Sequence, residues 1–275
     1  MFKSLIRTFA IVAAFIAGYM MPGLHVYSWM FKWMLIVMLF VTFLGIRFKR
    51  MKPERAHWLL TGANLMVALA AWGVCRLVFG DGYLAQAAFF VGIMPTATAA
   101  PVVMGLLGGS VEFMLTALLL INGIICALLP FILPAVVGRG GFEIYLNVAQ
   151  NISLVMLLPL ALALAARRFY PRAIAWPRKL KDVTFGIWVV ILVLIAANAS
   201  YDISSREGIS ERVLEQIGVI ALLVCGVNFG LGYLLGGRTR AAECSQALGQ
   251  KNTTLSIYLA LTYASPIAAL GPTFY

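Results

Sequence analysis

One apolar stretch with an interruption in its middle decides the fold: Gly92-Ile93-Met94-Pro95-Thr96-Ala97-Thr98-Ala99-Ala100-Pro101. It lies in a run, 83–107, that is otherwise apolar and long enough to cross a bilayer at about 1.5 Å per residue. A second interruption lies in the run 243–264 and reads Gln246-Ala247-Leu248-Gly249-Gln250-Lys251-Asn252-Thr253-Thr254. Interrupted helices inside a membrane indicate a binding site, because free backbone groups can face a ligand there.

The composition excludes a soluble protein. Of 275 residues, 62% are apolar and 11% are charged, and the mean hydropathy is +0.94. A soluble domain has about half apolar and a quarter charged residues. Inside the apolar runs we find no nucleophile paired with a base, no HExxH motif and no paired aspartates, and the four cysteines form no CxxC pair. We therefore expect an all-α polytopic membrane protein that is not an enzyme and has no cofactor or metal.

The net charge of +11 reflects topology. Basic residues gather in short loops that fall on one side when the spans are counted, and these residues are Lys3, Arg7, Arg47, Lys49, Arg50, Lys52, Arg55, Arg167, Arg168, Arg172, Arg178, Lys179, Lys181, Arg238 and Arg240. By the positive-inside rule that side is cytoplasmic. The sequence thus predicts a multi-pass protein of the inner (plasma) membrane with a cytoplasmic N-terminus, and no nucleic-acid partner.

The runs long enough to span a bilayer are 5–21, 29–46, 57–79, 83–107, 111–137, 147–166, 183–200, 213–235 and 243–264. A tenth begins after Pro266 and stops at Tyr275, so we expect the last helix to be incomplete. A division near Gly138 gives five spans in 1–138 and five in 139–275. Because five is odd, the two repeats would enter the membrane from opposite sides, which predicts the inverted-repeat (5+5) fold of secondary transporters.

Three stretches resemble motifs of the bile acid:sodium symporter family. Met94 to Pro101 resembles the fourth-span pattern cysteine-proline-glycine-glycine-threonine-alanine-serine-asparagine, and Ala247 to Asn252 resembles the ninth-span pattern glutamate-valine-glycine-methionine-glutamine-asparagine. Asn228 to Gly236 is similar to an eighth-span glycine-isoleucine-glycine-tyrosine-leucine-leucine-glycine stretch. The resemblance, to bacterial homologues of the apical sodium-dependent bile acid transporter, implies ten helices.

Within those ten helices, the resemblance implies that helices 4 and 9 are broken and cross at the substrate site. It further implies core helices 3–5 and 8–10 and panel helices 1–2 and 6–7. The implied substrate is an organic anion, either bile-acid-like or a smaller carboxylate.

The sodium ligands of the family are largely replaced in this chain. The diverged positions in the two breaks are Ala100, Pro101, Ala247 and Lys251, and the family's third-span glutamine falls about at Ala63. None of the ten acidic residues lies mid-span, although a sodium site in low dielectric usually needs a carboxylate. We therefore expect transport without sodium, in which the Lys251 ammonium supplies the positive charge that sodium supplies in relatives.

The predicted substrate site is formed by polar and proline residues of both breaks: Thr96, Thr98, Pro101, Gln250, Lys251, Asn252 and Thr253. Asn64 in the third span is a further candidate, since it lies one position from the family's glutamine. Because a lysine in a membrane can also release its proton, a sodium- or proton-coupled symporter of the same family stays open. A membrane receptor on a transporter scaffold, without transport, is a further alternative.

Overall fold

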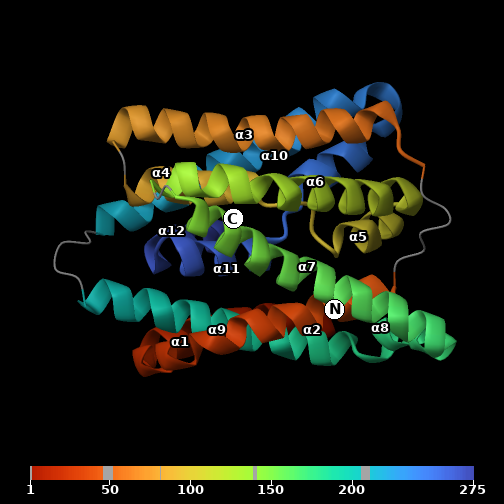
Figure 1. Ribbon diagram of the computed structural model, residues 1–275, viewed down its shortest axis with the longest axis horizontal. Helices are drawn as coiled ribbons and strands as arrows, with labels where there is room; N and C mark the ends of the chain where they lie inside the picture. Colours follow the sequence, from red (N-terminus) through yellow and green to blue (C-terminus); the bar gives the residue numbers. More distant parts are fainter. Residues whose placement is uncertain (1, 46–51, 81, 139–140, 206–210) are drawn as a thin grey trace. The chain divides into compact units, whose positions relative to one another are not determined.

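The computed structural model describes residues 2–45, 52–80, 82–138, 141–205 and 211–275. These residues are almost wholly helical and contain no strand (Figure 1). In chain order the elements are α1 (Phe2–Met20), η1 (Pro22–Trp29), α2 (Met30–Leu44), α3 (Arg55–Phe79), α4 (Tyr83–Ile93), α5 (Ala100–Leu106), α6 (Val111–Val137), α7 (Phe142–Phe169), η3 (Pro171–Ala175), α8 (Trp176–Lys179), α9 (Lys181–Ser205), α10 (Glu211–Gly249), α11 (Thr253–Tyr263) and α12 (Pro266–Phe274).

Among the described residues, six helical stretches are long and apolar enough to cross a membrane: Pro22–Leu44, Arg55–Phe79, Val111–Val137, Phe142–Phe169, Lys181–Tyr201 and Arg212–Gly249. Helices satisfy their own backbone groups, which lipid requires of a spanning segment. The expected class, an all-α protein with several membrane-spanning helices, agrees with these elements.

Two of the predicted spans have different boundaries in the structure. The run 83–107 consists of two helices, α4 and α5, separated by residues 94–99. The first part of the run 243–264 belongs with the preceding span to α10, but non-helical backbone at Gly237 and Arg240 divides α10 into two helices. Gly237 has a φ of 56°, a left-handed value that glycine adopts without a Cβ penalty. The Ser245 hydroxyl donates to the Phe229 carbonyl, 16 positions earlier, at 2.9 Å. The chain therefore turns back between the predicted spans 213–235 and 243–264, where the sequence predicted a loop.

The chain divides into two compact units. The first consists of Met1–Ile46 and Ser153–Ile209. In it α1 packs along α9, where a Cβ on Gly18 would lie 2.3 Å from the Val193 carbonyl oxygen, so only glycine permits this approach. The Ser200 hydroxyl also donates to the Tyr19 carbonyl at 2.9 Å.

The second unit consists of Arg47–Ile152 and Ser210–Tyr275. Its centre is α4, whose residues from Ala87 to Ile93 are all buried. Helix α3 approaches α4 closely, since a Cβ on Gly92 would lie 2.5 Å from the Ala68 Cα. Helix α12 packs on α4 as well, with Gly271 placed against the Ala87 carbonyl. This buried short helix positions the candidate site at its carboxyl end.

Candidate functional site

The first break separates α4 from α5. Pro95 disfavours the helical conformation at Met94, whose φ of −47° and ψ of 126° are indeed non-helical. Pro101 lies in the first turn of α5, where a proline costs nothing because the first amides of a helix have no intrahelical acceptor. The two prolines thus end one helix and start the next. Residues 94–99 between them lack the regular backbone hydrogen bonds of a helix.

The second break, residues 250–252, pairs with the first. Thr96 and Lys251 form an antiparallel bridge. The Ala97 amide donates to the Gln250 carbonyl at 2.8 Å, and the Asn252 amide donates to the Pro95 carbonyl at 2.7 Å. An unpaired backbone group costs several kcal/mol in a bilayer, so each break supplies the partners that the other has lost. The predicted convergence of the two breaks is therefore present in the second unit.

Side chains from other elements bind the carboxyl end of α4. The last four carbonyls of a helix have no partner within it. The Asn64 amide nitrogen donates to the Ile93 carbonyl at 3.3 Å, and the Ser256 hydroxyl donates to the Phe90 carbonyl at 2.7 Å. Lys251 Nζ lies 3.4 Å from the Gly92 carbonyl oxygen. Helices α3 and α11 and the second break therefore meet at this one helix end.

Lys251 is the central charged group of the site. Lys251 is 7% exposed. Its ammonium donates to the Asn64 side-chain oxygen and to the Gly92 carbonyl. Within the described ranges no carboxylate forms a salt bridge with it. Its electrostatic partners are instead the amide oxygen and the carboxyl end of α4, which has the partial negative charge of a helix dipole.

The remaining predicted site residues lie at or beside the crossing. Pro101 is buried at the start of α5. The Thr96 hydroxyl is buried and donates to the Ala247 carbonyl at 2.7 Å, so it is a structural group. The others are half-buried, and in the part of the chain that the structure describes their side chains have no hydrogen bond: Thr98, Gln250, Asn252 and Thr253. The hydrogen-bonding capacity of these four side chains is therefore unused within the described residues.

The positions that the resemblance assigned to sodium ligands are buried and have no side-chain oxygen. Ala63, Ala100 and Ala247 are at most 4% exposed. Among the described residues no group of three or more histidine, cysteine, aspartate or glutamate side chains is arranged to hold a metal ion. The side chains that hydrogen-bond to the last carbonyls of α4 are those of Asn64, Lys251 and Ser256.

Two hydroxyl groups of the site were not predicted from the sequence. Ser256 binds Phe90, as described above, and the Tyr275 hydroxyl donates to the Gly249 carbonyl at 2.6 Å. Gly249 is the last residue of α10, so Tyr275 satisfies a carbonyl that the second break frees. A serine and a tyrosine in apolar runs give no signal of such roles, because the partners lie far away in the chain.

Comparison of the sequence with models of known protein families and with curated proteins finds no match.

Proposed function

We propose that the chain is a secondary transporter of organic anions that works by alternating access. In this proposal it has the ten-helix inverted-repeat scaffold of the bile acid:sodium symporter family, and the Lys251 ammonium replaces a sodium ion. The observation that supports it best is the set of Lys251 partners: a side-chain amide oxygen and a carbonyl at the end of a half-helix. Transporters of this kind coordinate sodium with half-helix carboxyl ends and unwound carbonyls.

The charge balance of the site favours an anionic substrate. Lys251 brings a full positive charge into a buried site, whose described residues offer it no carboxylate. Taking a lone charge out of water is costly, and a bound counter-charge offsets that cost. An organic anion would supply this charge, while Thr98, Gln250, Asn252 and Thr253 would offer neutral hydrogen-bonding groups for its orientation.

Uptake into proteoliposomes tests the proposal. The anions would be cholate and a set of small carboxylates, the external salt would be sodium or choline chloride, and empty liposomes would be the blank. We expect saturable uptake of at least one anion at equal rates in both salts, and its loss in Lys251→Met, whose unbranched side chain is similar in shape but has no charge. Binding of an anion without any flux would contradict transport and favour the receptor alternative.

A pH gradient across the membrane tests whether the proton is the coupling ion. Since arginine does not deprotonate in proteins, Lys251→Arg keeps a fixed charge. If Lys251 only holds that charge, a pH gradient leaves uptake by the native chain unchanged and Lys251→Arg retains part of it. Proton-driven uptake that Lys251→Arg abolishes would instead establish a proton-coupled carrier.

A further inference from the structure

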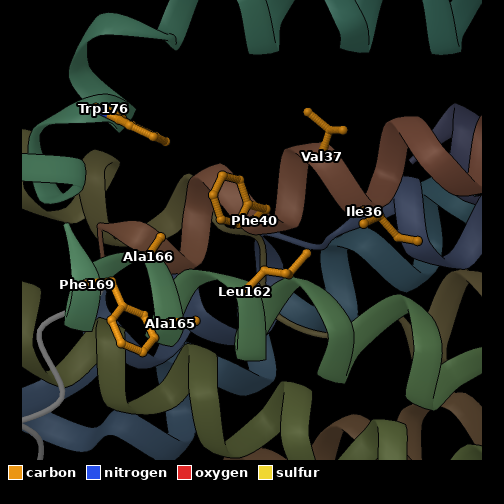
Figure 2. A pocket seen from close by; sticks show the side chains of 8 residues that line it. All are labelled: Ile36, Val37, Phe40, Leu162, Ala165, Ala166, Phe169 and Trp176. Atoms are coloured by element: carbon orange, nitrogen blue, oxygen red, sulfur yellow. The ribbon is translucent and has the colours of Figure 1, made fainter.

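The first unit contains an apolar groove that lies outside the crossing. Its volume is about 480 Å³, which is within the usual range of small-molecule sites. Helix α2 contributes Ile36 and Phe40, and α7 contributes Leu162 and Phe169. Figure 2 shows Trp176 and Phe169 at one end and Ile36 toward the other. All the lining side chains are aliphatic or aromatic, so the groove suits a hydrocarbon chain.

The length of the groove accommodates part of one acyl chain. The α7 residues that line it run from Leu162 to Phe169, which is about 10 Å along a helix at 1.5 Å per residue. Carboxylate or hydroxyl groups, which would orient a polar substrate inside the groove, are absent from its described lining.

Exposed basic residues flank, in the chain, the aromatic residues at one end of the groove. Phe169 and Trp176 are 85% and 36% exposed, and tryptophan is enriched where a membrane meets water. Between and beside them in the chain lie the exposed residues Arg168, Arg172, Arg178 and Lys179. Arg168 belongs to the last turn of α7, and Arg178 and Lys179 belong to α8. The apolar groove thus has basic residues next to it in the chain, within three residues of Phe169 or Trp176.

We propose that this groove binds an anionic glycerophospholipid, with one acyl chain along α2 and α7 and the phosphate near the bases of η3 and α8. Basic pockets between membrane helices are known to bind anionic headgroups. Because the sequence predicts that these bases are cytoplasmic, the lipid would come from the inner leaflet. This site is independent of the proposed transport function.

Native mass spectrometry of the full chain in detergent tests headgroup selectivity. The probes are dioleoyl phosphatidylglycerol and dioleoyl phosphatidylcholine, added at equal concentration. We expect retained phosphatidylglycerol in clear excess. The variant Arg168→Gln/Arg172→Gln/Arg178→Gln should lose more than tenfold of that preference, since each base near an anionic lipid contributes about a fivefold factor.

The matched control is Lys52→Gln/Arg55→Gln/Arg238→Gln, which removes the same charge from exposed bases of the other unit. The control should keep the native preference. Equal loss in both triple variants, or no preference in the native chain, would overturn the proposal. So would a groove-dependent dimer in place of bound lipid.

Photolabelling locates the acyl chain without any variant. Phosphatidylglycerol with a diazirine in one acyl chain would be incorporated into nanodiscs with the native chain, and labelled peptides would be mapped. We expect labelling to concentrate on α2 and on the 162–169 segment of α7, well above that of Leu222 and Leu223, which are 73% and 63% exposed on α10. Equal labelling of α10 would overturn a specific site. Competition by cholate that removes the label would assign the groove to substrate and overturn the proposal as well.

Discussion

The two breaks of the second unit interrupt helices in similar ways but are built from different residues. The first, 94–99, follows from Pro95 and Pro101, and its buried part is mainly apolar. The second, 250–252, has no proline and contains Lys251 between two polar residues. Proline ends a helix by its own covalent structure, whereas a break without proline needs partners elsewhere. The second break finds them in the first, through the Pro95 and Ala97 backbone groups.

This difference implies that the two breaks have different roles. The first break provides a rigid frame with carbonyls at the end of α4 that have no partner within their own helix, and the second brings a charge to one of them. Substitutions at Lys251 should therefore affect both binding and stability. Substitutions that only change packing around the first break should affect stability first.

The largest effect is expected from Lys251→Ala. The change removes the donor to Asn64 and Gly92 and leaves a cavity, which together should lower the free energy of unfolding by about 3 kcal/mol. Thermal unfolding in detergent measures it, and anion binding should be lost in parallel. Lys251→Arg should retain part of both properties. Unchanged stability and binding in Lys251→Ala would show that the lysine is merely tolerated.

The next largest loss of stability is expected when the glycine before each break is replaced by alanine. In Gly92→Ala the new Cβ would meet the Ala68 backbone at 2.5 Å, so α3 and α4 must separate, at a cost of about 2 kcal/mol. In Gly249→Ala it would meet the Phe229 ring at 2.4 Å. A side-chain ring can turn away, so the loss should be about half as large. Melting temperatures of the pair measure the difference, and a larger loss at Gly249 would contradict a rigid first break.

The smallest changes in stability are expected at the two threonines of the first break. Thr96→Val removes the hydrogen bond to the Ala247 carbonyl and should cost about 1 kcal/mol of stability. The Thr98 hydroxyl is half-buried and has no such bond among the described residues, so Thr98→Val should change stability by less than about 0.5 kcal/mol. If Thr98 faces the anion, its variant should still weaken binding measurably. Equal stability losses would contradict the separate roles of these hydroxyls.

The sequence predicted the positions of both breaks because their causes are local. Pro95 acts on Met94, and a row of polar residues from Gln250 to Thr254 has no apolar interpretation. It also indicated Asn64 as a candidate. The identity of the Lys251 partners could not be predicted from local pattern, because Asn64 lies 187 positions away.

The loop expected after the span 213–235 also has a local cause. Gly237 has a φ of 56°, which glycine adopts readily, and the two helices of α10 meet there. A Cβ on Gly236 would lie 2.7 Å from the Ala241 Cα, so the two helices approach closely at this turn. The roles of Ser256 and Tyr275, by contrast, depend on carbonyls that only the folded arrangement brings near them.

The central claim is that the Lys251 ammonium takes the place of sodium. Titration of the native chain with cholate, or with the small carboxylate that shows uptake, in sodium chloride and in choline chloride at equal ionic strength tests it most directly. We expect dissociation constants within about twofold in the two salts, because the positive charge is already part of the chain. A sodium-specific gain of more than about tenfold, equivalent to 1.4 kcal/mol, would contradict the claim.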